Sequence, residues 1–312
     1  MADKKATREA YGAALAEFGA DERIVVLDAD LSKSTKTDTF KKVYPERFIN
    51  AGIAEADMMC VAAGLAACGK IAFASSFAMF AAGRAFEQIR NSICYPGLNV
   101  KIGATHAGIS VGEDGATHQC LEDLALMRSL PGMVILNPAD AVEARLAVKA
   151  AIEHDGPCYL RFGRLAVEQI FDEDYKFEIG TGVELKDGKD VTIIATGLMV
   201  SFALEAAKIL EDEGISARVV NIATIKPIDK DIIIKASKET GAIVTAEEHN
   251  VIGGLGSAVA EVLCEGAPCV MKRIGTQDVF GRSGTPAELF KEYGLTAADI
   301  ANSAKQAIAE KK

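Results

Sequence analysis

Residues 48–69 read FINAGIAEADMMCVAAGLAACG. The first few are typical of a short apolar strand that ends in a glycine turn, and the rest favours a small-residue helix that opens at Glu55. After Asp57 no charged residue follows until Lys70. An acid in the first turn of a helix interacts favourably with the helix dipole and stabilises the helix by ~0.3–1 kcal/mol. Because residues 51–56 offer it no cation, we also expect a desolvated Glu55 that handles a proton near neutral pH.

Segments with strand and helix character alternate on both sides of this stretch. Further strands are expected at 23–30, 70–76, 100–106, 133–140 and 158–162, and a second set at 191–197, 217–225, 242–250 and 269–275. Helices are expected at 6–20, 55–69, 77–95, 119–130, 141–155, 198–213, 229–240 and 254–265, with two more within 285–311. Such alternation indicates parallel sheets.

The alternation breaks once, between Gly163 and Asp190, into short polar pieces such as FDEDYKFEIGTG. This break predicts a linker. We therefore predict an α/β protein of two unequal domains, each a sheet covered by helices on both faces. The predicted boundaries are residues 1–165 for the first domain, 166–189 for the linker and 190–312 for the second domain.

Composition limits the classes of function. The chain has 312 residues, of which 49% are hydrophobic and 25% charged, as in a globular protein with room for two domains. A net charge of −10 argues against a nonspecific nucleic-acid binder. No apolar run approaches the ~20 residues of a membrane span. Seven cysteines without a CxxC pair indicate reduced thiols, so we expect a cytoplasmic protein with no nucleic-acid or membrane partner.

The polar residues at the carboxyl ends of the expected strands are the candidates for a site, because ligands bind at that edge of an open parallel sheet. They are Asp28, Asp30, Ser32, Ser34, Glu55, Ser75, Ser76, His106, Glu113, Asp114, His118, Arg161 and Arg164.

Two histidines, His106 and His118, flank a glycine-rich loop. They are solvated loop residues, metal ligands, or donors to a polyhydroxylated or phosphorylated ligand. Their spacing matches no established metal motif, so no metal site is predicted in this chain. Phe77 and Phe80 fit either the core or a platform for a cofactor ring.

Two arginines lie at the end of the strand expected at 158–162, namely Arg161 and Arg164. Arginines at a strand end either clamp a phosphate or form surface salt bridges. Residues 251–258, VIGGLGSA, open a helix after a strand but do not fit GxGxxG in register. Their glycines indicate a tight turn instead of a nucleotide site.

Five segments together resemble the C-terminal part of transketolases. They are GIAEADMMCVAAGLA (52–66), SFAMFAAGRAFEQIRN (76–91), ATHAGISVGEDGATHQCLEDLALMRSLPGM (104–133), EEHNVIGGLGSAVAEVL (247–263) and DVFGRSGTPAELFKEYGL (278–295). The resemblance covers nearly the whole chain, and GEDGATHQ with its upstream His106 is the most specific part. It implies a pyrimidine-binding domain followed by the family's C-terminal domain.

The resemblance implies thiamine diphosphate as the cofactor. Glu55 matches the glutamate that bonds N1′ of the aminopyrimidine and so helps to generate the ylid. Phe77 and Phe80 match the aromatics that pack on that ring, and Asp30 matches an acid near the thiazolium. Gly83 stands where many transketolases have a tyrosine, so that contact is absent or supplied by another residue.

The resemblance also implies the substrate contacts. His118, which joins Glu55 as a catalytic residue, and Asp114 match residues that hold the hydroxyls of the donor sugar. Three residues match the substrate phosphate site: His106, Ser34 and Arg161. Arg164 is the competing choice for the arginine.

One family motif is missing from the sequence. Transketolases bind the diphosphate and its Mg2+ or other divalent metal through a GDG-type motif, whereas this chain has only GEDGATHQ of the substrate loop. We therefore expect the C-terminal subunit of a split transketolase, which pairs with a separate N-terminal subunit that holds most of the metal site, as an α2β2 assembly acting on sugar phosphates. The alternatives are a subunit similar to 1-deoxyxylulose-5-phosphate synthase or to the 2-oxoacid dehydrogenase beta chain, or a non-catalytic stabilising partner.

Overall fold

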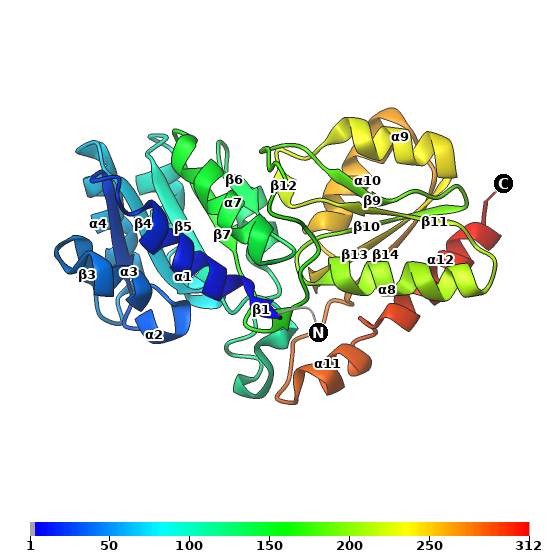
Figure 1. Cartoon of the computed structure of the whole chain (residues 1–312), viewed down its shortest axis with the longest axis horizontal. Coiled ribbons are helices and arrows are strands. Elements are labelled where there is room, and N and C mark those ends of the chain that lie inside the picture. The colour runs from blue at the N-terminus through cyan, green and yellow to red at the C-terminus, as the bar shows by residue number, and fades with distance from the viewer. Residues whose placement is uncertain (1–3, 312) are drawn as a thin grey trace.

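A computed structural model describes residues 4–311 as two α/β units side by side (Figure 1). The first unit contains a seven-stranded sheet in the order β12-β6-β7-β5-β4-β2-β3. Its strands are β2 (Ile24–Asp28), β3 (Phe48–Asn50), β4 (Ile71–Phe77), β5 (Val100–Thr105), β6 (Val134–Leu136), β7 (Cys158–Arg161) and β12 (Thr224–Lys226). All neighbouring pairs are parallel except β12 with β6. The carboxyl ends of β2, β3, β4 and β5 therefore meet at one edge.

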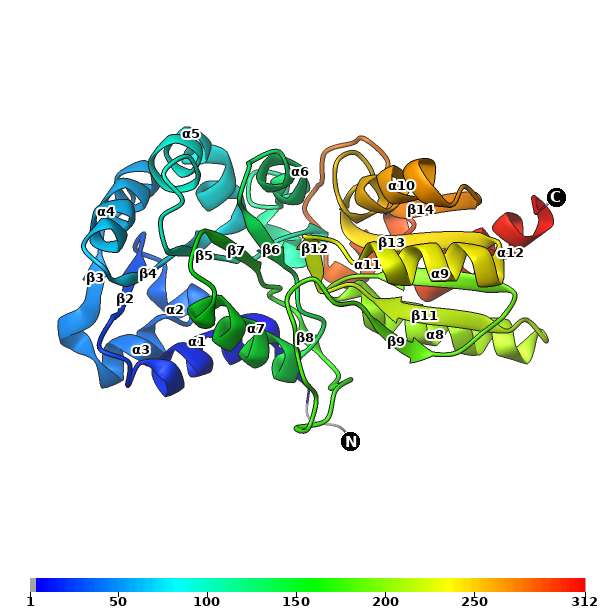
Figure 2. The same ribbon diagram turned by 90° about the horizontal axis from the view of Figure 1, so that it is seen from above.

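Helices cover both faces of this sheet (Figure 2). One face packs against α1 (Thr7–Phe18), α3 (Asp38–Val43) and α7 (Ala141–Glu153), and the other against α4 (Glu55–Ala67), the segment 79–94 and α6 (Asp123–Arg128). The composition of α4 explains its place, because its buried side chains, apart from Glu55, are alanines and methionines that allow a close approach to β4.

The second unit contains a five-stranded sheet in the order β14-β13-β10-β11-β9, in which only β9 is antiparallel. Its strands are β9 (Val183–Lys186), β10 (Val191–Ala195), β11 (Ala217–Asn221), β13 (Ala242–Asn250) and β14 (Val270–Thr276). The helices around it are α8 (Met199–Asp212), α9 (Lys230–Thr240), α10 (Leu255–Gly266) and α12 (Ala297–Ala309). The predicted α/β class with helices on both faces is confirmed.

Several short elements lie outside this alternation. They are β1 (Lys5–Ala6), which pairs with β8 (Ala166–Val167), the turns α2 (Ser32–Thr35), α5 (Phe86–Gln88), η1 (Pro45–Arg47) and η4 (Ile109–Asp114), and helix α11 (Pro286–Glu292). The region expected as a linker, residues 166–189, is not wholly irregular, since it contributes β8 and β9 to sheets. The predicted domain boundaries remain a prediction.

Two expected elements differ from the observed ones. The single strand expected at 217–225 divides: β11 stays in the second sheet, whereas β12 crosses to pair with β6 of the first. The helix expected at 77–95 consists of two π-type turns, η2 (Met79–Arg84) and η3 (Ile89–Cys94), around α5. Wide turns of this kind often occur at functional sites.

Among residues 4–311, no helix is both long and apolar enough to cross a membrane. All seven cysteines are free thiols, and three of them, Cys60, Cys68 and Cys264, are exposed.

Candidate active site

The candidate site lies at the carboxyl edge of the seven-stranded sheet. Glu55 is the first residue of α4, directly after the turn that follows β3. Phe77 ends β4, and His106 follows β5. Ser34 lies in the short helical turn after β2. Neighbouring parallel strands thus bring together residues from four separate parts of the sequence.

Glu55 is buried at 4% exposure, but the structure gives it a cationic partner. Arg84 Nη1 lies 3.0 Å from Glu55 Oε1, and the Arg84 side chain is 52% exposed. The expectation of an unpaired carboxyl is therefore wrong. The residues next to Glu55 in sequence include no cation, but Arg84 reaches Glu55 from the π-type turn η2, 29 residues further along the chain.

Arg84 links Glu55 to a row of aromatic rings. Its guanidinium carbon lies 4.0 Å from the centre of the Phe80 ring, within the range of a cation–π interaction. Phe80 stacks on Phe77, with ring centres 5.8 Å apart and planes at 21°. The imidazole of His118 meets Phe80 edge-on at 5.2 Å, and that of His106 lies 3.9 Å from Phe77. Contacts therefore run without interruption from Glu55 to His106.

His106 is a buried imidazole surrounded by cations. Arg8 Nη1 lies 3.0 Å from its Nε2, and Thr105 Oγ1 lies 2.9 Å from its Nδ1. Because a guanidinium only donates, Nε2 must accept, which assigns the proton to Nδ1. Burial, and then the nearby charges of Arg8 and Arg164, lower the pKa of His106 to about 3. His106 is therefore neutral at physiological pH.

The loop after β2 is held by Asp28. This buried carboxylate accepts hydrogen bonds from Leu31 N at 2.6 Å, Thr35 Oγ1 at 2.7 Å and Thr37 Oγ1 at 2.9 Å. Ser34 lies in the turn so formed, and its carbonyl accepts from Arg8 at 2.8 Å. Asp28 thereby fixes the backbone that brings Ser34 close to His106.

Asp30 lies in the same loop, exposed and with a positive φ of 64°. Its Oδ1 accepts a hydrogen bond from Asn50 Nδ2 at 2.9 Å, which connects the ends of β2 and β3. Asp30 thus faces solvent at the edge of the sheet where the site lies.

Arg161 does not reach this site. It is 3% exposed and donates to Asp123 through Nε at 2.8 Å and Nη2 at 3.1 Å. Nη2 also donates to the Glu248 carbonyl at 3.0 Å. Its burial, and the bonds that hold Nε and Nη2 inside the core, argue against the expected phosphate contact of Arg161.

Arg164 is the arginine that lies near His106. Its side chain is 38% exposed, and its charge acts on the His106 imidazole. Nη1 donates to the Val111 carbonyl and lies 3.9 Å from Asp114 Oδ2. His118 and Asp114 belong to the same glycine-rich loop, and Thr117 Oγ1 lies 2.9 Å from His118 Nδ1.

Two family models match most of the chain. Residues 3–169 match the transketolase pyrimidine binding domain, and residues 180–300 match the transketolase C-terminal domain. The chain belongs to the transketolase family.

Three relatives of this family are similar over nearly their whole length. The putative transketolase C-terminal section of Methanocaldococcus jannaschii is 55% identical, covering 95% of this chain and 94% of the relative. The 6-deoxy-6-sulfo-D-fructose transketolase subunit SqwH of Clostridium sp. (strain MSTE9) is 44% identical over 98% and 95%. A solved structure described as "Split gene transketolase, inactive beta4 tetramer" is 59% identical, with a TM-score of 0.93 and coverage of 98% and 99%.

Within this transketolase fold, sequence reasoning missed three cations at the site: Arg8, Lys36 and Arg84. Arg8 lies in the first turn of α1, not at the end of a strand, so the rule about strand ends could not select it. Lys36 acts on His106 from an αL position after α2. Arg84 stood inside the quoted aromatic segment, and only its contact with Glu55 reveals it.

The site supplies no metal ligand set of its own among residues 4–311. No group of three or more His, Cys, Asp or Glu side chains is arranged there to hold a metal ion.

Proposed function

We propose that this chain is the C-terminal subunit of a two-chain transketolase. It would transfer a two-carbon ketol unit from a ketose phosphate to an aldose phosphate with thiamine diphosphate as cofactor. The observation that carries the proposal is the row of contacts from Glu55 through Phe80 and Phe77 to His106. At one end, the buried carboxylate of Glu55 lies beside aromatic rings. At the other end, the charges of Arg8 and Arg164 lie near the imidazole of His106.

The residues at the Glu55 end fit the aminopyrimidine of the cofactor. When bound, thiamine diphosphate supplies the electron sink for carbon–carbon bond cleavage. Glu55 would hold a proton at N1′, since its carboxylate lies at the start of α4 beside apolar surface. Phe77 and Phe80 would offer their faces to the ring. Arg84 already bonds Oε1 of Glu55, so it must share that carboxylate with the cofactor or move aside.

The residues at the other end fit a phosphorylated sugar. Arg8 and Arg164 would pair with the phosphate, and His106, neutral because of its lowered pKa, would donate or accept without adding charge. His118 would contact the hydroxyls of the donor. Asp114 and Ser34 lie beside Arg164 and Arg8, and we propose Asp114 as a further contact to the hydroxyls and Ser34 as a further contact to the phosphate. Asp30, bonded to Asn50 at the end of β3, is proposed to lie near the thiazolium and the substrate's hydroxyls.

The partner is proposed from the missing diphosphate motif and from the exposed surface beside the site. Ile53, two residues before Glu55, is 77% exposed, and Val61 on the same helix is 39% exposed. Apolar side chains at the mouth of a site suit contact with another chain. We propose an N-terminal subunit here, holding the diphosphate and a divalent metal such as Mg2+, in an α2β2 assembly that functions in the cytoplasm.

The test is co-purification of this chain from its native host, followed by assays with and without added thiamine diphosphate. The proposal predicts a second chain with a GDG motif and cofactor-dependent ketol transfer between sugar phosphates. Cofactor-dependent condensation of pyruvate with an aldose phosphate would indicate the synthase-like alternative. Partner binding with no cofactor-dependent activity would favour a stabilising subunit.

A further inference from the structure

The loop between His106 and His118 is held in an unusual backbone conformation. Its glycines Gly108, Gly112 and Gly115 have φ of 85°, 80° and 77°, and His106 itself has φ of 56°. A non-glycine residue in this region costs about 1–3 kcal/mol and persists only when its surroundings hold it there. The position of both histidines therefore depends on what packs against this loop.

The first domain supplies part of that support. Gly108 N donates to the Cys120 carbonyl at 3.0 Å, and Ala107 N donates to the Phe162 carbonyl at 3.4 Å. These bonds fix the two ends of the loop. Gln119 Nε2 also supports the turn from within the first domain, because it donates to the Ile109 and Gly112 carbonyls at 3.3 and 3.1 Å. The Ser110 N–H, however, has its partner elsewhere.

The second domain supplies that partner. Glu248 lies in β13, and its Oε1 accepts a hydrogen bond from Ser110 N. The residue is only 4% exposed. The Gly108 backbone is pressed against the same carboxylate, since a Cβ on Gly108 would lie 2.3 Å from Glu248 Cδ. The loop and this side chain are thus fitted to each other.

Glu248 is kept in place by buried polar contacts of its side chain and its backbone. Burial raises the pKa of its carboxyl, and the nearby Arg161 opposes that shift. Its backbone carbonyl accepts from Arg161, which is itself paired with Asp123. Two residues on, Asn250 N donates to the Leu121 carbonyl at 2.9 Å, so the end of β13 is attached to the segment that follows His118.

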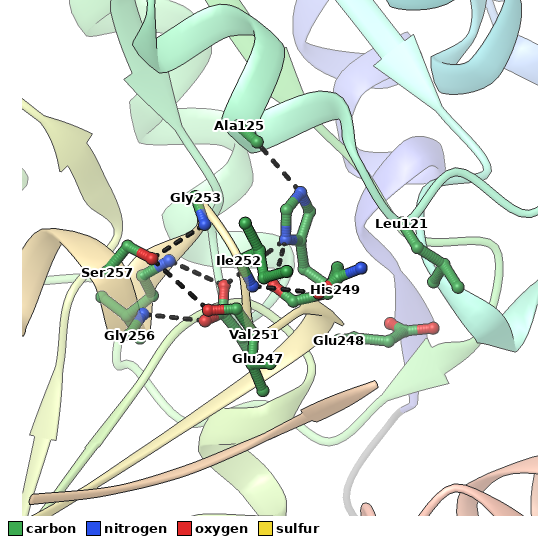
Figure 3. A network of polar contacts seen from close by, with 12 residues as sticks. Leu121, Ala125, Glu247, Glu248, His249, Val251, Ile252, Gly253, Gly256 and Ser257 are labelled. Carbon is green, nitrogen blue, oxygen red and sulfur yellow. Dashed lines mark hydrogen bonds and ion pairs between the residues drawn. The ribbon is translucent and has the colours of Figure 1, made fainter. Parts of the chain in front are cut away.

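The neighbouring Glu247 has a different task. Side chains of successive strand residues point to opposite faces, and its carboxylate bonds Leu255 N and Gly256 N at 2.7 Å each, at the start of α10. Figure 3 shows the two carboxylates directed away from each other. Glu247 stabilises the second domain internally, whereas Glu248 reaches the loop of the first domain.

We infer that Glu248 is a positioning residue: through Ser110 and Gly108 the second domain sets the conformation of the loop that carries His106 and His118. The effect of Glu248 on substrate binding rests on the proposed function, whereas its effect on the loop conformation does not. It gives the second domain a direct part in the site, although none of its residues belongs to the row from Glu55 to His106.

The first test is amide hydrogen exchange in the isolated chain, which requires no activity. Glu248→Ala should speed exchange across residues 107–117 about tenfold or more, the effect of losing a hydrogen bond to a charged group. Glu248→Gln keeps an acceptor of the same size and should restore most of the protection. Glu247→Ala is the matched control and should speed exchange at the start of α10 but not in the loop.

The second test uses the assembled enzyme. Glu248→Ala should raise KM for the donor sugar about tenfold. Glu247→Ala should leave KM within about twofold, even where the two variants lose the same unfolding free energy. Equal loop exchange in the two alanine variants, or unchanged exchange in Glu248→Ala, would overturn the inference. If the wild-type assembly shows no ketol transfer, the proposed function fails, and the exchange result still decides whether Glu248 holds the loop.

Discussion

Arg161 and Asp123 form a two-point ion pair inside the protein, with Nε–Oδ2 at 2.8 Å and Nη2–Oδ1 at 3.1 Å. The exposed fractions of the two side chains are 4% and 0%. Burial alone would raise the pKa of Asp123, but the adjacent Arg161 holds it below the usual range. Tyr159 also donates to Asp123 at 2.8 Å. This pair fixes the end of β7 against α6.

Loss of Arg161 should therefore act on folding. Arg161→Ala leaves the Asp123 charge buried and unpaired, so the unfolding free energy of the isolated chain should fall by about 3–5 kcal/mol. Urea denaturation followed by circular dichroism measures this change. Arg164→Ala is the control and should cost less than about 1 kcal/mol, because Arg164 is partly exposed. Similar losses for both arginines would contradict the assignment.

Loss of Arg8 or Arg164 should act on substrate binding. Each lies near His106 and offers a guanidinium to an anion, so Arg8→Ala and Arg164→Ala should raise KM for phosphorylated donors about tenfold or more. Unphosphorylated donors should change much less. Arg23→Ala is a suitable control, because Arg23 pairs with Asp21 at the other end of β2. Equal effects on both kinds of donor would place the phosphate contact elsewhere.

Substitutions can distinguish the role of Glu55 from that of its neighbours on α4. Glu55→Gln keeps the size and removes the ionisable group, so turnover of the assembled enzyme should fall at least about 100-fold. Asp57→Asn, at an exposed position two residues further along the same turn, should leave turnover within about twofold. Size-exclusion chromatography checks that both variants still assemble. Turnover near wild type in Glu55→Gln would remove its proton role.

The two buried histidines predict acid sensitivity. Burial is the main cause that lowers the pKa of His106 to about 3 and that of His249 to about 4. Both are neutral when folded and take up a proton on unfolding below about pH 6.5, so acid favours the unfolded state. Each can steepen the fall in unfolding free energy by up to about 1.4 kcal/mol per pH unit between pH 6 and 4.

His106→Asn isolates one of these contributions. Its unfolding free energy should fall less steeply than that of the wild type between pH 6 and 4, whereas above pH 7 the two curves should run parallel. Urea denaturation at a series of pH values measures both slopes. Identical slopes throughout would mean that His106 is not a buried neutral group.

The sequence predicted the fold well because alternation of buried strands and helices is a local signal. The fold brings Glu55, Phe77, Phe80, His106 and His118 together, as the meeting of strand ends at one edge predicts, while their roles remain a proposal. The sequence could not distinguish Arg161 from Arg164, because the burial of Arg161 depends on Asp123, which lies 38 residues away in sequence.

Other features could not be predicted from local patterns. Arg8 reaches His106 from a helix start 98 residues earlier, and Arg84 reaches Glu55 through a π-type turn. The crossing of β12 into the first sheet also depends on pairing with β6, a contact between distant segments. Each of these is a tertiary contact with no periodic signature.

Reconstitution tests the central claim most directly. The purified chain is assayed for ketol transfer from xylulose 5-phosphate to ribose 5-phosphate with thiamine diphosphate and Mg2+, alone and after mixing with a separately purified N-terminal subunit. Glu55→Gln serves as the inactive control. The account predicts no transfer by the isolated chain and cofactor-dependent transfer by the mixture. Full activity of the isolated chain, or none in a mixture that assembles, would contradict it.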